Sequence, residues 1–170
     1  TSKYRLFRWA MPPTLPDHQL IAIARSDDFA FGVLHSRLHE VWSLAKIGRK
    51  GVGNDPVYAP TFAFDTFPFP WPLNAPDGKL TPEQRRRREA IAEAARALDE
   101  QRERWLNPPE LVREEPDVVP SLPPRSVPVS LDAAKQLKTR TLTNLYNARP
   151  AWLDLAHKRL DEAVFAAYGW

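Results

Sequence analysis

The stretch "LTPEQRRRREAIAEAARALDEQRERWLNPP", Leu80 to Pro109, carries a long helical pattern with a signal at each end. Thr81 can cap the helix, Pro82 suits the first helical position, and Gln84 completes a capping box. A mostly apolar stripe then recurs at helical spacing: Ile91, Ala94, Ala95, Leu98, Arg102 and Trp105. Because prolines stop the pattern, we expect one helix from Pro82 to Leu106.

A second long helix is expected at the C-terminal end of the chain. Pro150 stands at its start and Gly169 ends it, and one face is apolar: Trp152, Leu155, Ala156, Leu160, Ala163, Val164 and Ala167. Residues 107–130 are rich in proline and are expected to form a linker that is polyproline-like or partly mobile. The stretch "LDAAKQL", Leu131–Leu137, indicates a short helix between this linker and the last helix.

Upstream of the long helix the pattern changes. Tyr4–Ala10 alternates apolar and polar residues and indicates a strand, and His18–Arg25 indicates a second one. Helical spacing predicts one amphipathic helix over Phe29–Ile47, in which we expect close packing to require Gly32. Val57–Pro72 is aromatic and proline-rich, which argues against a central strand or a helix and favours an extended segment whose phenylalanines insert into grooves on the fold. We expect its part Phe62–Phe69 to anchor the preceding basic loop to the Phe29–Ile47 helix.

These patterns predict an α+β protein that is mostly α. Residues 1–76 would hold short strands and one helix, and residues 77–170 would form a small helical domain built on the two long helices. The chain has 170 residues, 18 prolines and no cysteine, which excludes disulfides and thiolate metal sites. Its apolar runs are too short to cross a bilayer. The strand-like start without a Met suggests a piece of a longer protein.

Net charge bears only weakly on the choice of partner. The formal charge is +3 with a pI near 9.3, which permits an anionic partner such as nucleic acid. The run Arg85–Arg88 shares its helix with many carboxylates, so we interpret it as a solvated face with intrahelical ion pairs. Contact of this run with phosphates is the alternative.

The tetrapeptide Asn107-Pro108-Pro109-Glu110 partly matches the Asn/Asp-Pro-Pro-aromatic signature of enzymes that methylate amines of DNA bases. That signature needs an aromatic fourth residue, since a flipped base is held by stacking as well as by hydrogen bonds. Glu110 cannot stack, and the tetrapeptide follows a helix rather than a strand. We therefore interpret it as a helix terminator and assign no catalytic residue. The chain also has no Gly-rich cofactor loop of the Phe-x-Gly-x-Gly kind.

Two histidines lie one helical turn apart in "HSRLHE". His35 and His39 at this spacing could bind zinc, but the His-Glu-x-x-His pattern places its glutamate between the ligands, whereas Glu40 follows both. We expect a structural role, with a hydrogen bond to the backbone or to a nearby aspartate. No metal-binding residue is assigned.

The loop that follows this region combines cations with glycines. Lys46, Arg49 and Lys50 stand among three glycines, which let a backbone approach a phosphate closely. Asn54, Asp55 and Tyr58 add donors and acceptors suited to base edges. An ordinary mobile loop has the same composition, so composition alone leaves both interpretations open.

Several stretches together resemble one protein family. Asp27–Trp42 ("DDFAFGVLHSRLHEVW"), Thr61–Pro70 ("TFAFDTFPFP"), Leu98–Pro109 ("LDEQRERWLNPP") and Thr141–Trp170 are similar to the C-terminal region of large single-chain bacterial DNA methyltransferases of the MmeI-like class. That class includes restriction–modification proteins and methyltransferases of phage-defence systems. The resemblance covers nearly the whole chain.

The resemblance implies that residues 1–76 end a target-recognition domain and that the helical domain follows it. The catalytic domain, with its S-adenosylmethionine site, would lie upstream, so this chain would methylate nothing alone and would hold no cofactor. Residues that choose the DNA sequence would lie before the "FPFP" box, within Arg49–Tyr58. The implied partners are double-stranded DNA and the upstream methyltransferase domain, in the bacterial cytoplasm near the nucleoid. The alternative is a protein-interaction or scaffold module that docks another subunit of a defence complex.

Overall fold

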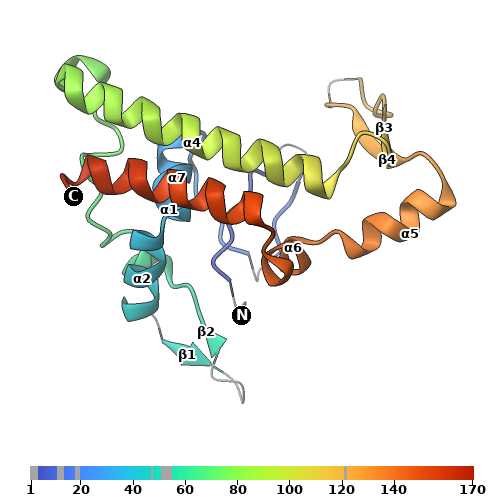
Figure 1. The fold of residues 1–170 in the computed structure, drawn as a ribbon, viewed down its shortest axis with the longest axis horizontal. Helices are drawn as coiled ribbons and strands as arrows, with labels where there is room; N and C mark the ends of the chain where they lie inside the picture. Colours follow the sequence, from blue (N-terminus) through green and yellow to red (C-terminus); the bar gives the residue numbers. More distant parts are fainter. Residues whose placement is uncertain (1–3, 11–13, 18–19, 47, 51–54, 121) are drawn as a thin grey trace.

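The computed structural model describes residues 4–10, 14–17, 20–46, 48–50, 55–120 and 122–170. Two long helices, α4 (Pro82–Leu106) and α7 (Ala151–Ala167), lie side by side, and α1 (Asp28–His35) packs against both (Figure 1). The fold class is α+β and mostly α, as predicted: the strands in the described part of the chain form two short antiparallel pairs.

The hydrophobic core lies where these three helices meet. Its fully buried side chains come mainly from α4 and α7, namely Ile91, Ala95, Leu98, Leu153, Leu160 and Val164. Phe29, Phe31 and Val33 of α1 and Leu145 of α6 (Leu142–Ala148) also belong to this cluster. The apolar stripes of both long helices therefore face each other, as the helical spacing predicted.

Helix α4 begins and ends where the sequence predicted. The Thr81 hydroxyl accepts from the Gln84 amide at 3.2 Å, and the Gln84 side chain accepts from the Thr81 amide at 2.9 Å. At the other end Asn107 is the C-cap, and its amide donates to the Glu103 carbonyl at 2.8 Å. Asn107 thus terminates the helix, which agrees with our interpretation of the Asn-Pro-Pro tetrapeptide.

The capping box makes the first turn of α4 sensitive to one side chain. Thr81→Ala is expected to lower the free energy of unfolding by about 1 kcal/mol, because the Gln84 amide loses the hydroxyl that accepts its hydrogen bond at the helix start. Denaturant unfolding with both variants checks this, and Thr81→Ser, which keeps the capping oxygen, should stay near the wild type. A Thr81→Ala protein as stable as Thr81→Ser would contradict the role of the cap.

The single helix predicted over Phe29–Ile47 was wrong, because the structure has two helices there. α1 ends at His35 and α2 (Arg37–Lys46) begins after Ser36, whose backbone is extended. The Ser36 hydroxyl donates to the Val33 carbonyl at 2.7 Å and accepts from the His39 amide at 3.3 Å, so one side chain caps both helices. From α7, Asp161 accepts from the Arg37 amide at 2.7 Å and fixes the break.

The two strands predicted upstream are also absent from the described residues. Residues 4–10, called here the N-terminal segment, are irregular, and so are residues 20–25, while residues 18–19 lie outside the described chain. A strand needs a neighbour that pairs with its backbone. In the N-terminal segment side chains take that place, since the Phe7 amide donates to His35 and the Phe7 carbonyl accepts from Arg102.

Two proline-rich regions hold more regular structure than predicted. Within Val57–Pro72, α3 (Pro60–Ala63) is one helical turn, and it tolerates Pro60 because a proline fits the first turn of a helix. A short 3₁₀ turn (Asp77–Lys79) leads into α4. Within the predicted linker, β3 (Val112–Glu115) pairs antiparallel with β4 (Arg125–Pro128), so this part is a hairpin and not a polyproline-like connector.

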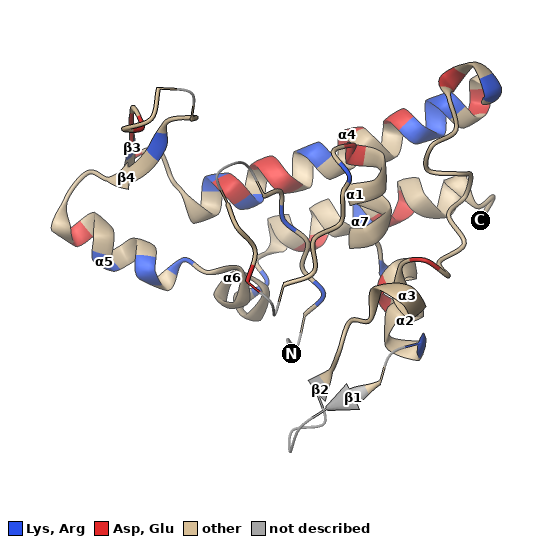
Figure 2. Ribbon diagram, turned by 180° about the vertical axis from the view of Figure 1, so that it is seen from behind, with Lys and Arg blue, Asp and Glu red and all other residues tan. Residues whose placement is uncertain are grey.

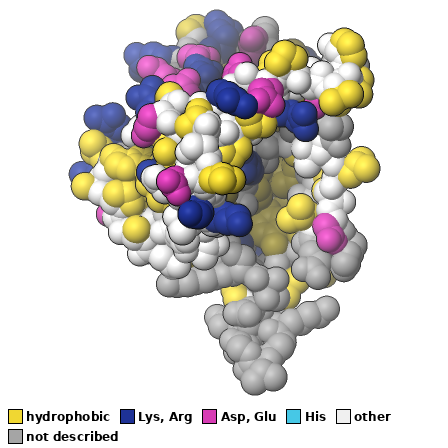
Figure 3. Space-filling view, turned by 90° about the vertical axis from the view of Figure 1, so that its right-hand side faces the viewer, with side chains coloured by type: hydrophobic (Ala, Val, Ile, Leu, Met, Phe, Trp, Pro, Cys, Tyr) yellow, Lys and Arg dark blue, Asp and Glu magenta, His cyan; other side chains and the backbone are white. Residues whose placement is uncertain are grey.

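The hairpin and the helix after it project from one end of the molecule. α5 (Leu131–Thr139) was predicted as a short helix, and it follows β4 directly (Figure 1). Leu131 is 84% exposed, and other apolar side chains near it are exposed too: Val118, Val119 and Val129. Seen from this end, hydrophobic side chains stand in the open among charged ones (Figure 3). The hairpin β3–β4 and α5 together are called the arm.

Candidate nucleic-acid interface

Two short strands flank the centre of the predicted DNA-contacting loop and pair with each other. β1 (Arg49–Lys50) pairs antiparallel with β2 (Asp55–Pro56), and the Val57 amide donates to the Gly48 carbonyl at 3.0 Å where the two strands enter the body. The strands extend away from α2 and the helical core (Figure 1). Residues 48–50 and 55–58, the described parts on either side of residues 51–54, are called the recognition hairpin.

The structure describes the six predicted contact residues to different depths. For Arg49, Lys50 and Asp55 it describes the backbone, which places them on the paired strands, and Asn54 lies outside the described residues. The Lys46 ammonium lies 4.8 Å from the centre of the Trp42 ring, at the exposed end of α2. A cation there complements the negative end of the helix dipole and stays accessible to an anion.

Tyr58 is half-buried, and its hydroxyl contacts the body. His39 Nδ1 lies 3.0 Å from the Leu34 carbonyl and therefore carries the proton, so the Tyr58 hydroxyl donates to the bare His39 Nε2 at 3.1 Å. Burial lowers the pKa of His39 to about 4 and raises the pKa of Tyr58. Tyr58 anchors the hairpin, and its contact with a base edge stays a prediction.

The aromatic segment also anchors this region, as predicted from its phenylalanines. The Phe67 ring centre lies 5.0 Å from that of His39 and 5.9 Å from that of Trp42, in edge-to-face arrangements. Phe67 itself is buried. The predicted docking of this segment on the helix that precedes the basic loop is therefore confirmed for Phe67, whereas Phe62 is 62% exposed.

The N-terminal segment supports the recognition hairpin from the other side, which the sequence did not suggest. Arg5 Nη2 donates to the Pro56 carbonyl at 3.1 Å, at the end of β2. The Phe7 ring lies edge-on to Tyr58, with centres 5.9 Å apart, and 5.7 Å from His39. All three contacts join residues more than 30 positions apart in the sequence, so no local pattern could have revealed them.

A buried arginine fixes the N-terminal segment in turn. Arg102 of α4 is 0% exposed; its Nη1 lies 2.8 Å from His35 Nε2, and its Nη2 donates to the Phe7 carbonyl at 2.8 Å. His35 Nδ1 contacts the Phe31 carbonyl at 3.0 Å, so Nε2 is bare and accepts. Burial and the adjacent guanidinium lower the pKa of His35 well below its usual range. His35 and His39 thus both have structural roles and form hydrogen bonds with backbone carbonyls, as predicted.

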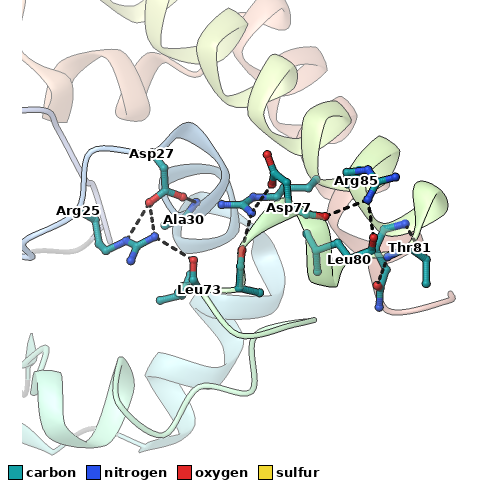
Figure 4. Close-up of polar contacts among 11 residues, drawn as sticks. Arg25, Asp27, Ala30, Leu73, Asp77, Leu80, Thr81 and Arg85 are labelled. Carbon is teal, nitrogen blue, oxygen red and sulfur yellow. Dashed lines mark hydrogen bonds and ion pairs between the residues drawn. The ribbon is translucent and has the colours of Figure 1, made fainter.

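The arginine run of α4 forms ion pairs and hydrogen bonds with other groups of the chain. Arg86 and Arg87 each pair with Glu83, at 2.6 Å and 2.7 Å, which confirms the intrahelical pairs. Arg85 donates to the Asp77 and Leu80 carbonyls and so fastens the 3₁₀ turn to the helix (Figure 4). Basic and acidic residues alternate along α4 (Figure 2). These contacts favour the structural interpretation of the run over a phosphate site.

A surface pocket of about 500 Å³ lies beside this run, between α1 and α4. It is lined by charges of both signs, among them Asp27, Asp28, Asp77, Arg85, Arg88 and Arg96. Most of these charges are paired: Arg25 with Asp27 at 2.6 Å (Figure 4), Arg88 with Asp77 at 3.2 Å, and Arg96 with Asp28 at 3.0 Å. The pairing leaves little net charge to attract an ion.

The described parts of the chain hold neither a metal-binding cluster nor a membrane-spanning helix. No group of three or more His, Asp or Glu side chains there is placed to hold a metal ion. No helix in those parts is both long and apolar enough to cross a bilayer. Comparison with protein-family models, with curated proteins and with solved structures found no match to the chain.

Proposed function

We propose that the chain is the DNA-recognition part of an adenine-specific DNA methyltransferase of a bacterial restriction–modification or phage-defence system, without catalytic activity of its own. The observation that carries the proposal is the recognition hairpin, which extends from the body with Arg49 and Lys50 on its first strand. The family resemblance of the flanking stretches supports it. S-adenosylmethionine would bind the upstream catalytic domain of the same polypeptide.

The hairpin has the parts that such a role needs. Its cations would neutralise phosphates and set the position on the duplex, while Asn54 and Asp55 would read base edges at roughly 1–3 kcal/mol of discrimination each. Its base is held by Arg5, by Phe7 and by the Tyr58–His39 hydrogen bond. A loop that is fixed at its base loses less conformational entropy when it binds.

The double variant Arg49→Ala/Lys50→Ala tests the proposal. It is expected to weaken binding of duplex DNA roughly 10- to 100-fold at moderate salt, because two phosphate contacts are lost. The slope of log K against log salt should become shallower by about 2. Fluorescence anisotropy across a salt series measures both quantities.

The matched control removes the same charge from exposed sites outside the hairpin. Arg86 and Lys135 side chains are each 78% exposed, on α4 and α5, so Arg86→Ala/Lys135→Ala changes the net charge equally. The control should leave DNA affinity within about twofold of the wild type. Equal losses in both double variants would mean that binding follows net charge, and the recognition hairpin would then have no special role.

A second candidate is a protein-interaction module for another subunit of a defence complex. It is favoured by a surface pocket of about 440 Å³ lined by Phe64, Phe67, Phe69 and Trp71, and by the exposed apolar side chains of the arm. Apolar docking depends little on salt, whereas DNA binding weakens steeply as salt rises. The same salt series applied to a co-purifying partner therefore separates the two candidates.

A further inference from the structure

We propose that Arg102 is a positioning residue for the recognition hairpin, although it does not contact the hairpin directly. Its guanidinium holds the N-terminal segment in the core, and that segment carries Arg5 and Phe7 to the hairpin base. Only the expected effect of Arg102 on DNA binding rests on the proposed function. The positioning itself is a property of the fold and can be measured without DNA.

The first step is the unusual pairing of Arg102. A fully buried cation is ordinarily paired with a carboxylate. Among the described residues Arg102 has no carboxylate at ion-pair distance, and its partners are the neutral His35 ring and the Phe7 carbonyl. Core packing alone would be served by an apolar side chain of similar length. The two hydrogen bonds are what the arginine adds.

The second step is what those bonds hold. Phe7 is attached at both backbone atoms, since its amide donates to His35 Nε2 at 3.2 Å while its carbonyl accepts from Arg102. His35 Nε2 also receives Arg102 Nη1, so the three groups form one closed arrangement. The N-terminal segment has no strand partner in the described structure, and this arrangement fixes its middle residue.

The third step leads from Phe7 to the hairpin. Two residues before Phe7, Arg5 donates to the Pro56 carbonyl, and the Phe7 ring itself packs on Tyr58. The Tyr58 hydroxyl binds His39, and the neighbouring Val57 amide closes the hairpin on Gly48. A displaced Phe7 therefore withdraws both Arg5 and its own ring from residues 56–58.

Amide hydrogen exchange in the variant Arg102→Met tests the positioning. Methionine keeps the length of the side chain and removes the hydrogen bonds, and it leaves no unpaired charge in the core. The Phe7 and Val57 amides should exchange on the order of tenfold faster than in the wild type, because local opening becomes easier. Amides in the middle of α7 should keep their wild-type protection.

A matched core variant separates positioning from general loss of stability. Leu160→Ala truncates a fully buried side chain of α7 and leaves the hydrogen bonds of the N-terminal segment in place. It should speed exchange in α7 while leaving Val57 near the wild type. Wild-type exchange at Phe7 and Val57 in Arg102→Met would overturn the proposal, and so would equal acceleration of Val57 in Leu160→Ala.

A double-variant cycle tests whether the effect passes through the N-terminal segment. Arg5→Met and Arg102→Met should each speed Val57 exchange, and together they should speed it by less than the product of the single effects. An effect equal to that product would mean that Arg102 acts by another route, which would also overturn the proposal.

DNA binding in the same variants distinguishes this inference from the proposed function. If both hold, Arg102→Met weakens duplex binding on the order of tenfold although Arg102 lies in the core and cannot reach a phosphate. Faster Val57 exchange in a chain whose wild type binds no DNA would sink the proposed function and leave the positioning role of Arg102 standing.

Discussion

Between pH 6.5 and pH 4 the free energy of unfolding is expected to fall by about 3 kcal/mol through His39 alone, with a similar loss through His157. Burial lowers the pKa of both side chains to about 4, whereas in the unfolded chain they take up a proton near pH 6.5. The unfolded state therefore binds more protons throughout this window, so acid favours it. His35 acts in the same direction.

This loss is large beside the ordinary stability of a small domain, about 5–15 kcal/mol. Denaturant unfolding at pH 7 and at pH 5 measures the part of this loss that lies above pH 5. His39→Gln and His157→Gln each remove one titrating group while keeping an acceptor for Tyr58 or Tyr146, and each should reduce the loss between pH 7 and pH 5 by about 2 kcal/mol. An unchanged pH dependence in either variant would contradict the assignment.

Two carboxylates oppose the loss of stability in acid, and they set the lowest pH at which the histidine effect can be measured separately. Burial raises the pKa of Asp99 and of Asp161, so the folded state holds their protons more tightly than the unfolded chain does. Acid therefore stabilises the fold through these two groups once the pH approaches their folded pKa values. The histidine effect is consequently clearest in the upper half of the window, above about pH 5.

Gly32→Ala is expected to lower the free energy of unfolding by about 1–3 kcal/mol, although alanine is the better helix former. A Cβ at Gly32 would lie 2.8 Å from Ile91 Cγ2 and 3.0 Å from Ala95 Cβ, and 3.2 Å from the Ile91 carbonyl. All three neighbours belong to α4, so α1 would have to move away from the core. The predicted need for close packing at Gly32 is thus confirmed.

Gly78→Ala is the matched control, since nothing lies within 4 Å of a Cβ built there. Its stability should equal or slightly exceed that of the wild type, because alanine reduces the freedom of the unfolded chain. Thermal or denaturant unfolding of both variants provides the comparison. A Gly32→Ala protein that is as stable as Gly78→Ala would mean that the α1–α4 crossing relaxes at little cost.

The parts of the fold that the sequence predicted correctly are those with local signals. The bounds of α4 follow from Thr81, Gln84 and the prolines after Leu106, all of which act within one turn. The break between α1 and α2 was missed because apolar spacing continues across it, and because part of its cause, Asp161, comes from α7. Helix propensity and the spacing of apolar residues do not reveal contacts between residues so far apart in the sequence.

The same distinction applies to the candidate site. Its basic composition and its position before the aromatic segment were visible in the sequence, and Phe67 docks as predicted. The support from Arg5 and Phe7 was invisible, because those contacts join residues far apart in the chain. One signal existed: Arg102 stood on an otherwise apolar stripe, where a charged residue calls for an explanation.

The hydrogen bond between Phe7 and Arg102 joins residues 95 positions apart, and this separation has a consequence for biosynthesis. The N-terminal segment leaves the ribosome early but cannot reach its native place until α4 has been made. At about 5–20 residues per second, that delay lasts roughly 5–20 seconds. During this interval the recognition hairpin lacks the support of Arg5 and Phe7, so its base reaches its native position only after α4 has packed against segments that were translated long before it.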